Sequence, residues 1–309
     1  MLPTKSQFSL SSATGIRKTH QESRSTPSKM LRLVIALMVA SCTVSALKIG
    51  AFNIQAFGDS KINNPEVCTI IMKILQRYDI VLIQEVRDAD LSAVTTMMTE
   101  LNGDLSEPTY SYVVSDTLGR DTYKERYLFV YRNDKASVHD SYHYHDHNMY
   151  TGEDTFSREP FVVTFHAPGT VIKDFVLVPL HSAPKAAVQE IDALYDVYVD
   201  ACEKCQSDNI IFLGDFNADC SYVTTSDWDS IRMYSSGDFT WLIADDIDTT
   251  VGKSNCAYDR IVISGADLHS AIVPDSAKVF NFQAKYKLTQ EQALAVSDHY
   301  PVELELMSA

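Results

Sequence analysis

Polar side chains able to transfer protons or bind metal ions stand next to short apolar runs at several places in this chain of 309 residues. Each apolar run reads as a strand, and the polar groups lie at its end. The groups are Asn53, Glu85, His181, Asp215 with Asn217, Tyr258-Asp259-Arg260 and Ser297-Asp298-His299. A single aspartate in such a place is more often a turn residue, and a single histidine is more often structural. Six such ends in one chain instead predict a shared cleft.

These residue types suit the hydrolysis of a phosphodiester. Carboxylate and amide oxygens are hard ligands that favour Mg²⁺, Mn²⁺ or Ca²⁺ over zinc. His181 and His299 can act as a base and an acid, and a carboxylate behind each imidazole would fix its tautomer and raise its pKa. The reaction needs a water to lose a proton, the phosphate charge to be neutralised and the leaving oxygen to be protonated.

The elements that position these groups are many strands and few, long helices. Strands are expected over 47–53, 80–85, 110–115, 127–131, 161–166, 175–180, 209–213, 258–264 and 299–306, and helices over 65–78, 88–101 and 185–205. This pattern predicts an α/β four-layer sandwich, in which two packed, mainly antiparallel β-sheets are flanked by helices. No repeat or linker interrupts residues 47–309, so a single domain is expected.

Residues 30–46 have the layout of a secretory signal peptide. Arg32 precedes an apolar run over 33–40, and small residues end the segment at Ala46. The run is too short to span a bilayer. A secreted chain cleaved after Ala46 is therefore expected, with residues 1–29 as a disordered upstream extension. The alternative is a transit peptide, because the first residues are Ser-rich and poor in acids.

The formal net charge of -15 argues against nucleic acid at first sight. Without residues 1–46, which carry six basic residues and one acidic residue, the charge becomes -20. A local group of arginines beside bound cations can nevertheless engage phosphate on an acidic body.

Eight short strings carry a resemblance that extends from Leu47 to the C-terminus. They are Ala51-Phe52-Asn53, Ile83-Gln84-Glu85-Val86-Arg87, Tyr123-Lys124-Glu125-Arg126-Tyr127, Ser157-Arg158-Glu159-Pro160, Leu180-His181-Ser182, Gly214-Asp215-Phe216-Asn217, Cys256-Ala257-Tyr258-Asp259-Arg260 and Ser297-Asp298-His299-Tyr300-Pro301. Gly-Asp-Phe-Asn and Ser-Asp-His alone would indicate only the wide exonuclease–endonuclease–phosphatase superfamily. Together with Asp219-Cys220-Ser221-Tyr222-Val223, the longer strings resemble the deoxyribonuclease I family.

The resemblance implies a Mg²⁺- or Mn²⁺-dependent endonuclease that cuts double-stranded DNA with little sequence preference. It pairs His181 with Glu125 and His299 with Asp259, without deciding which imidazole is the base. The resemblance also implies three further roles. Glu85, Asn53 and Asp298 would bind the catalytic ion, and Asp215 and Asn217 would orient the phosphate and the attacking water. Arg87, Tyr123 and Arg158 would contact DNA in its groove. The alternatives are surface ion pairs for the two arginines and a core position for Tyr123.

The resemblance also implies features outside the cleft. Cys220 and Cys256 match a structural disulfide, whereas Asn148 and Thr151 replace the half-cystines of a second one. Structural Ca²⁺ would stabilise the protein at two sites, with Asp146, Asp154, Phe156 and Glu159 at the first and Asp248 and Thr250 at the second. Some family members bind monomeric actin near the positions of Tyr112 and Val114, with Asp116 close by. A monomeric enzyme is expected.

Two features fall outside the resemblance. Cys202 and Cys205 form a C-x-x-C without a second pair of metal ligands, so zinc is not expected there. A loop over 143–154 holds His143, His145 and His147, which favours a solvated segment over adventitious metal binding.

Two other functions remain open at this point. One is a phosphoesterase of the same fold with another substrate, such as a sphingomyelinase or an inositol phosphate phosphatase. The other is an actin-binding relative with an inactive site. Arg87, Tyr123 and Arg158 favour DNA over the first, and the two histidines with their carboxylates argue against the second.

Overall fold

Two six-stranded β-sheets form the centre of the computed structural model, which describes residues 46–103, 109–146 and 154–309. The first sheet has the order β11-β12-β1-β2-β4-β3, with β1 at Leu47–Phe57, β2 at Ile80–Val86, β3 at Tyr110–Val114, β4 at Arg126–Arg132, β11 at Lys278–Val279 and β12 at Val302–Leu306. The second has the order β5-β6-β7-β8-β10-β9, with β5 at Ser137–His143, β6 at Phe161–His166, β7 at Asp174–Pro179, β8 at Ile210–Asp215, β9 at Thr240–Trp241 and β10 at Asp259–Ser264. The expected signal peptide lies outside the described residues.

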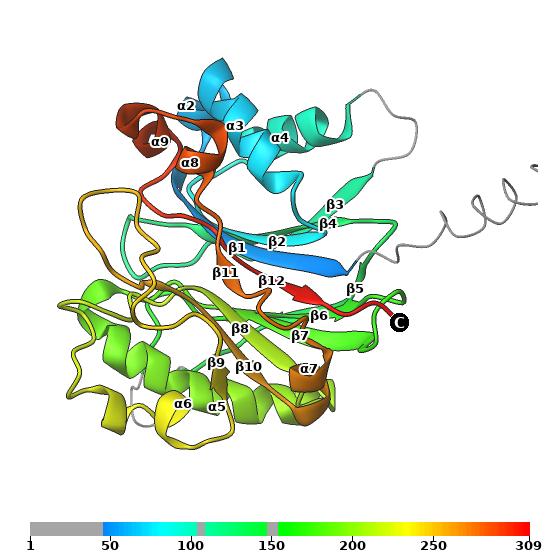
Figure 1. Cartoon of the computed structure of the whole chain (residues 1–309), viewed down its shortest axis with the longest axis vertical. Helices are drawn as coiled ribbons and strands as arrows, with labels where there is room; N and C mark the ends of the chain where they lie inside the picture. Colours follow the sequence, from blue (N-terminus) through cyan, green and yellow to red (C-terminus); the bar gives the residue numbers. More distant parts are fainter. Residues whose placement is uncertain (1–45, 104–108, 147–153) are drawn as a thin grey trace, which may run out of the picture. The chain divides into compact units, whose positions relative to one another are not determined.

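Helices cover the outer face of each sheet, so the four layers run helix, sheet, sheet, helix (Figure 1). Over the first sheet lie α2 at Asp59–Ile62, α3 at Pro65–Leu75, α4 at Ser92–Asn102, α8 at Phe282–Tyr286 and α9 at Gln290–Val296. The second sheet carries α5 at Ala187–Cys205 and α6 at Arg232–Ser235 on its outer face, and α7 at Ala266–Ala271 follows β10. The predicted fold class is confirmed. Each sheet holds one parallel pair, β1 with β2 and β7 with β8, among antiparallel neighbours.

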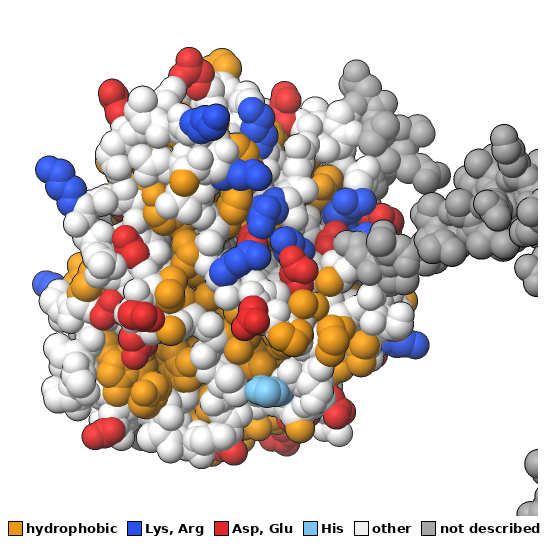
Figure 2. All heavy atoms as spheres, in the orientation of Figure 1, with side chains coloured by type: hydrophobic (Ala, Val, Ile, Leu, Met, Phe, Trp, Pro, Cys, Tyr) orange, Lys and Arg blue, Asp and Glu red, His pale blue; other side chains and the backbone are white. Residues whose placement is uncertain are grey.

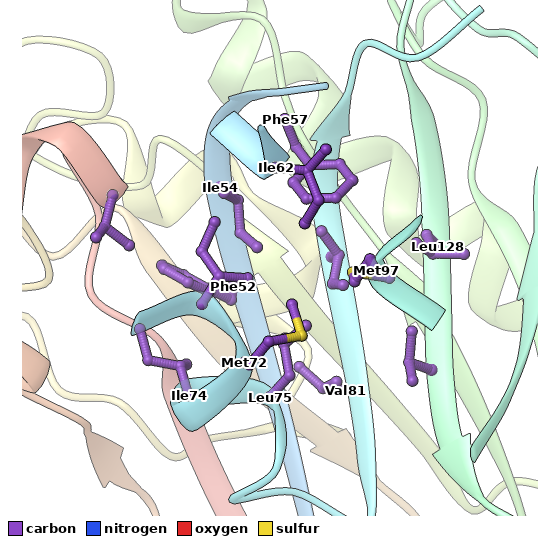
Figure 3. Packing of buried hydrophobic residues seen from close by; sticks show 14 of the residues in the cluster. Phe52, Ile54, Phe57, Ile62, Met72, Ile74, Leu75, Val81, Met97 and Leu128 are labelled. Atoms are coloured by element: carbon purple, nitrogen blue, oxygen red, sulfur yellow. The ribbon is translucent and has the colours of Figure 1, made fainter. Parts of the chain in front are cut away.

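Strand β1 is apolar on both faces because it lies inside the first sheet. Leu47 and Ile49 face the core between the two sheets, whereas Phe52 and Ile54 face the helices. Figure 3 shows this outer packing, in which Phe52 and Val81 meet Leu75 of α3. Side chains are buried on both faces of β1 and β2, and this packing fixes the position of the two strands that carry Asn53 and Glu85.

Helix α3 begins where its sequence predicts. The Asn64 side chain accepts hydrogen bonds from the backbone N–H groups of Glu66 and Val67, at 3.1 and 3.3 Å, and Pro65 occupies the first turn. The periodic apolar residues Ile71 and Leu75 then pack against the sheet.

Several elements differ from the sequence-based expectation. Strand β5 was not expected, because most of its side chains are polar and at least partly exposed on an edge strand. The short helices α7, α8 and α9 were also not expected. The long helix α5 begins at Ala187, after a 3-10 turn over Pro184–Ala186, and not at Lys185. The last two long strands begin at Asp259 and Val302, because the residues before them belong to the cleft.

The expected disulfide between Cys220 and Cys256 is present, while Cys68, Cys202 and Cys205 are free thiols. Positions Asn148 and Thr151, where the second bridge would lie, fall outside the described residues. Within the described ranges, no helix is long and apolar enough to cross a membrane.

Basic side chains gather in a band on one face of this acidic protein (Figure 2). Three basic side chains surround the buried carboxylate of Glu303: Arg77 at 2.6 Å, Lys48 at 3.6 Å and Lys278 at 3.9 Å. The overall negative charge is therefore not spread evenly over the surface.

Candidate active site

Two histidines in the cleft are each backed by a buried carboxylate. His181 Nδ1 lies 2.6 Å from Glu125 Oε1, and His299 Nδ1 lies 2.8 Å from Asp259 Oδ2. A carboxylate is an acceptor, so each Nδ1 carries the proton and donates it. Each ring therefore presents its Nε2 atom for reaction.

Asp215 lies between the two rings. Its Oδ2 atom is 3.6 Å from Nε2 of His181 and 3.6 Å from Nε2 of His299. The two imidazoles thus face one carboxylate oxygen from different sides. A phosphate held beside Asp215 would be within reach of both nitrogen atoms.

Strand ends bring this group together. Asp215 ends β8 and pairs directly with Asp259 at the start of β10. His181 follows β7, the other neighbour of β8. Gly214 allows Gln84 and Leu180 to lie close to the backbone of β8. A Cβ atom at this position would lie 2.5 Å from the Gln84 side chain and 2.6 Å from the Leu180 carbonyl oxygen. Its φ of 127° is also one that residues other than glycine rarely adopt.

The buried carboxylates favour the charged form of both imidazoles. Burial lowers the pKa of His299, but the charges of Asp259 and Asp215 outweigh burial and raise that pKa to about 10. Burial likewise lowers the pKa of His181, and the charge of Glu125 more than reverses this, so the pKa lies above its ordinary value. For Glu125, burial raises the pKa, but the charges of His181 and Arg158 prevail and lower it. Glu125 and His181 thus hold one another ionised. Burial has the larger effect on Asp259 and raises its pKa, although the charge of His299 opposes this.

A second group of oxygen ligands lies next to Asp215. The Asn53 side chain donates to Glu85 Oε1 and to Asp215 Oδ2, both at 3.2 Å. Glu85 Oε2 accepts from the backbone N–H of Ala56 at 2.8 Å, and Asp298 Oδ2 accepts from the Gln55 amide at 2.8 Å. Asn53 Oδ1 and Asp298 Oδ1 are buried and, among the residues described, have no hydrogen-bond partner. Unpaired buried oxygen atoms of this type suit a hard divalent cation.

Asp215, Asp259 and His299 offer three possible ligand atoms that all lie within 4.8 Å of one another, close enough to hold one metal ion. Glu85 and Asp298 do not join two other such groups at that spacing within the described part of the chain. The predicted ligands Asn53, Glu85 and Asp298 therefore border this cluster and do not already enclose a cation.

Two site residues adopt backbone conformations unusual for their type. Glu85 has a φ of 56° and Asn217 a φ of 50°, both in the left-handed region. Such strain persists only where surrounding contacts hold the chain in place, and it is concentrated at functional sites. Here the Asn217 backbone N–H donates to Asp215 Oδ1 at 3.0 Å, and its side chain donates to the Ser182 carbonyl at 3.1 Å.

The three predicted DNA-contact residues lie in two different settings. Arg87 stacks on the ring of Tyr123, with its guanidinium 3.8 Å from the ring centroid, and Tyr123 is 43% exposed. Tyr123 is therefore a surface residue and not a core one. Arg158 has a side chain only 13% exposed and forms an ion pair with Glu125. It belongs to the buried network behind His181 as well as to the cleft wall.

The first predicted calcium group is partly engaged by other partners. Asp146 Oδ2 accepts from the backbone N–H groups of Thr155 and Phe156, while its buried Oδ1 has no partner among the described residues. Arg120 lies 3.5 Å from the carboxylate of Asp154 and donates to the Phe156 carbonyl oxygen at 3.2 Å. In this structure a guanidinium cation thus contacts two of the predicted ligands. Glu159, the fourth predicted ligand, is partly buried.

The second predicted calcium group forms a hydrogen-bonded loop. Asp248 Oδ1 accepts from the Thr250 backbone N–H at 2.9 Å, from its hydroxyl at 2.7 Å and from the Cys256 backbone N–H at 3.3 Å.

The residues expected near an actin contact, Tyr112 and Val114, lie on β3, the edge strand of the first sheet, and Tyr112 is exposed.

Several buried residues hold the site although no individual role was assigned to them from the sequence. Gln84 accepts from the Asp215 backbone N–H and donates to the Leu180 carbonyl, while the Tyr127 hydroxyl accepts from the His181 backbone N–H at 2.8 Å. The Ser297 hydroxyl donates to the Asn53 carbonyl at 2.6 Å. Thr249 Oγ1 accepts from the Asp259 backbone N–H at 3.1 Å. The one sequence signal available was Gln84, a polar residue at the end of an otherwise apolar strand.

Two central sheets, two carboxylate-backed histidines and a group of oxygen ligands at the strand ends define a metal-assisted phosphoesterase of the two-sheet type. The sequence model of the Endonuclease/Exonuclease/phosphatase family matches residues 50–299, and the chain belongs to that family.

Among curated proteins, the chain is similar to deoxyribonucleases over nearly its whole length. It is 57% identical to Deoxyribonuclease-1-like 2 of Mus musculus over 274 residues, covering 89% of this chain and 96% of the relative. Identity to Deoxyribonuclease-1 of Homo sapiens is 53% over 278 residues, covering 90% and 98%. Deoxyribonuclease-1 of Rattus norvegicus is 54% identical over 277 residues, covering 90% and 96%.

Solved structures agree on the fold. The human Nocturnin catalytic domain with bound sulfate aligns with a TM-score of 0.57 at 14% identity, covering 85% of this chain and 95% of that one. TDP2 of D. rerio complexed with a single-strand DNA product gives a TM-score of 0.56 at 14% identity, covering 84% and 98%. At such identities the likeness supports the fold alone.

Proposed function

We propose that this protein is a secreted, divalent-metal-dependent endonuclease that hydrolyses phosphodiester bonds of double-stranded DNA with little sequence preference. The observation that carries the proposal is the placement of two carboxylate-backed imidazoles around Asp215. Relatives at more than half identity named as deoxyribonucleases support DNA as the substrate.

The two histidines divide the proton transfers. One imidazole takes a proton from the attacking water at its Nε2 atom, and the other gives a proton from Nε2 to the leaving oxygen. Glu125 and Asp259 each bind the Nδ1 atom of one ring, so Nε2 is the atom of each ring that takes or gives the proton. Asp215, together with Asn217, positions the phosphate and the water between the rings.

Glu85, Asn53 and Asp298 are the residues that would hold the catalytic ion, Mg²⁺ or Mn²⁺. Their donor set is carboxylate and amide oxygen, and two of the oxygen atoms are buried and unpaired within the described residues. When bound, the ion supplies neutralisation of the charge that develops on the phosphate.

Groove recognition is assigned to Arg87, Tyr123 and Arg158. The stacked pair of Arg87 and Tyr123 projects a flat, cationic edge into solvent next to Glu85, since the Tyr123 hydroxyl lies 3.3 Å from Glu85 Oε2. A pair of side chains with this shape would respond to the width of the groove and to the charge of the phosphate backbone, and it would make few base-specific hydrogen bonds. Such contacts are consistent with cleavage that has little sequence preference.

Further assignments belong to the same proposal. Ca²⁺ would stabilise the protein at Asp146, Asp154, Phe156 and Glu159, where binding would displace the Arg120 guanidinium from Asp154, and also at Asp248 and Thr250. Export through the segment 30–46 is supported by the disulfide, which forms in oxidising compartments. A monomer is proposed, and the exposed edge around Tyr112 is the proposed contact for monomeric actin.

Plasmid cleavage tests the proposal. Purified residues 47–309 are incubated with supercoiled plasmid and Mg²⁺ plus Ca²⁺, with and without EDTA. Nicking and linearisation that EDTA abolishes are expected. Intact plasmid, with release of phosphocholine from sphingomyelin or of phosphate from an inositol phosphate, would assign the site to another phosphoesterase.

A further inference from the structure

A buried glutamate lies behind the His181 pair, and the roles proposed above do not use it. Glu190 stands in the first turn of α5 and is 0% exposed. Its Oε1 atom accepts from the backbone N–H of Ser157 at 3.3 Å and from that of Ala183 at 3.2 Å. Its Oε2 atom is buried and has no hydrogen-bond partner in the part of the chain that the structure describes.

The two donors belong to different loops of the cleft. Ser157 directly precedes Arg158, and Ala183 lies two residues after His181. Arg158 and His181 both contact the same carboxylate oxygen, Glu125 Oε1. One oxygen atom of Glu190 therefore ties together the two backbone segments that carry the two cationic partners of Glu125.

Core packing alone does not call for a carboxylate at this position. The neighbouring buried positions on the same face of α5, Ala187, Ile191 and Leu194, are apolar and belong to the core beneath the second sheet. A carboxylate placed there loses its hydration, which is unfavourable unless polar partners replace it. The partners of Glu190 include the two loop N–H groups, the Ser157 side chain and, electrostatically, the Arg158 charge.

We infer that Glu190 is a positioning residue, which locks the Arg158 loop to the His181 loop so that both side chains converge on Glu125. The inference rests on the proposed function, since it assigns Glu190 to the active geometry of the His181 pair. The essential property is an acceptor oxygen held at this depth. An amide oxygen in the same place can accept both hydrogen bonds, whereas a methyl group cannot.

The test compares three variants within one helix. Glu190→Gln keeps an acceptor of equal reach, and Glu190→Ala removes it. Asp192→Ala is the matched control: Asp192 also lies on α5, but it pairs with Arg232 at 2.8 Å, away from the cleft. Thermal unfolding reports stability, and plasmid cleavage with saturating Mg²⁺ reports kcat and KM. All three are measured beside the wild type.

Loss of the two buried hydrogen bonds that join the loops predicts a fall in kcat of about tenfold or more for Glu190→Ala. Glu190→Gln should stay within about threefold of wild type, and Asp192→Ala should lower the unfolding temperature with unchanged kcat. A merely structural role would make the two alanine variants lose activity in proportion to their instability.

Three results would overturn the inference: wild-type kcat in Glu190→Ala, equal losses in the two alanine variants, or a Glu190→Gln variant as slow as Glu190→Ala. Should Glu190→Ala not fold, Glu190→Asp takes its place, because the shorter side chain keeps the charge but cannot reach both loops. A wild type that leaves plasmid intact would refute the proposed function itself. Rapid cleavage by wild type and Glu190→Ala alike would refute only this inference.

Discussion

Substitution of Glu125 by glutamine separates the catalytic and the structural roles of one buried carboxylate. Glu125 Oε1 lies 2.6 Å from His181 Nδ1 and also pairs with Arg158. A hydrogen bond to a charged group contributes about 1.5–3 kcal/mol. Removal of that amount from the transition state lowers kcat by a factor of about 10 to about 150.

The same substitution leaves the Arg158 charge without its main counter-ion. The Arg158 side chain is only 13% exposed, and breaking a buried ion pair from one side costs about 3–5 kcal/mol of stability. The double variant Glu125→Gln/Arg158→Met no longer carries the uncompensated charge. We expect it to regain much of the lost stability while kcat remains low, because the partner of His181 is still missing.

The pH dependence follows from the sign of the His181 shift. The folded-state pKa of His181 lies above its ordinary value of 6.5. Its protonated ring therefore stabilises the fold fully below pH 6.5, and this stabilisation is lost as the pH rises through the raised folded-state pKa. In Glu125→Gln that alkaline decline should disappear.

Single-turnover plasmid cleavage and urea unfolding at several pH values measure both effects. Wild-type kcat in Glu125→Gln would refute the role assigned to this pair. A double variant no more stable than Glu125→Gln would refute the account of the buried charge.

Three further outcomes are expected. His181→Ala and His299→Ala should each lower the cleavage rate by about 10²–10⁴-fold, and near-normal cleavage by either variant would remove that residue from the mechanism. Replacing Cys220 and Cys256 by serine opens a disulfide with a sequence separation of 36, which should cost about 4 kcal/mol in urea unfolding; an unchanged midpoint would contradict this. Glu303 has a lowered pKa, since the cations around it outweigh the effect of burial. The stability that it contributes is present above its ordinary pKa of 4.5 and is lost as the pH falls through the lowered value, so Glu303→Gln should unfold with a flatter acid limb.

The fold and the chemical groups of the cleft could be predicted from the sequence for a physical reason. Buried strands such as β2 are nearly uniform in hydrophobicity, and a polar residue at the end of such a strand, like Glu85, is conspicuous. Strand β5 escaped prediction because its edge position leaves polar residues such as His139 and Asp140 in contact with water. The periodic spacing of apolar residues identifies strands and helices that bury one face, but it does not identify elements whose side chains stay in contact with water.

The supporting shell could not be predicted in the same way. Gln84, Thr249 and Glu190 act through backbone groups that lie far away in sequence, and no local pattern marks such partners. Arg158 shows a related limit, because its type indicated phosphate binding, whereas its ion pair with Glu125 depends on tertiary packing. Only the assembled sheets show which polar side chains face solvent and which face one another.

The two ends of the folded domain meet in one sheet, where Leu47 of β1 pairs with Leu306 of β12. The cleft is divided in the same way, since Asn53 comes from the first strand and His299 from the residues just before the last. During synthesis, β1 can pair early with β2 on one side, whereas its other neighbour, β12, is made more than 200 residues later. A copy that lacks residues 297–306 has no complete cleft, because both His299 and the strand β12 that pairs with β1 would be missing.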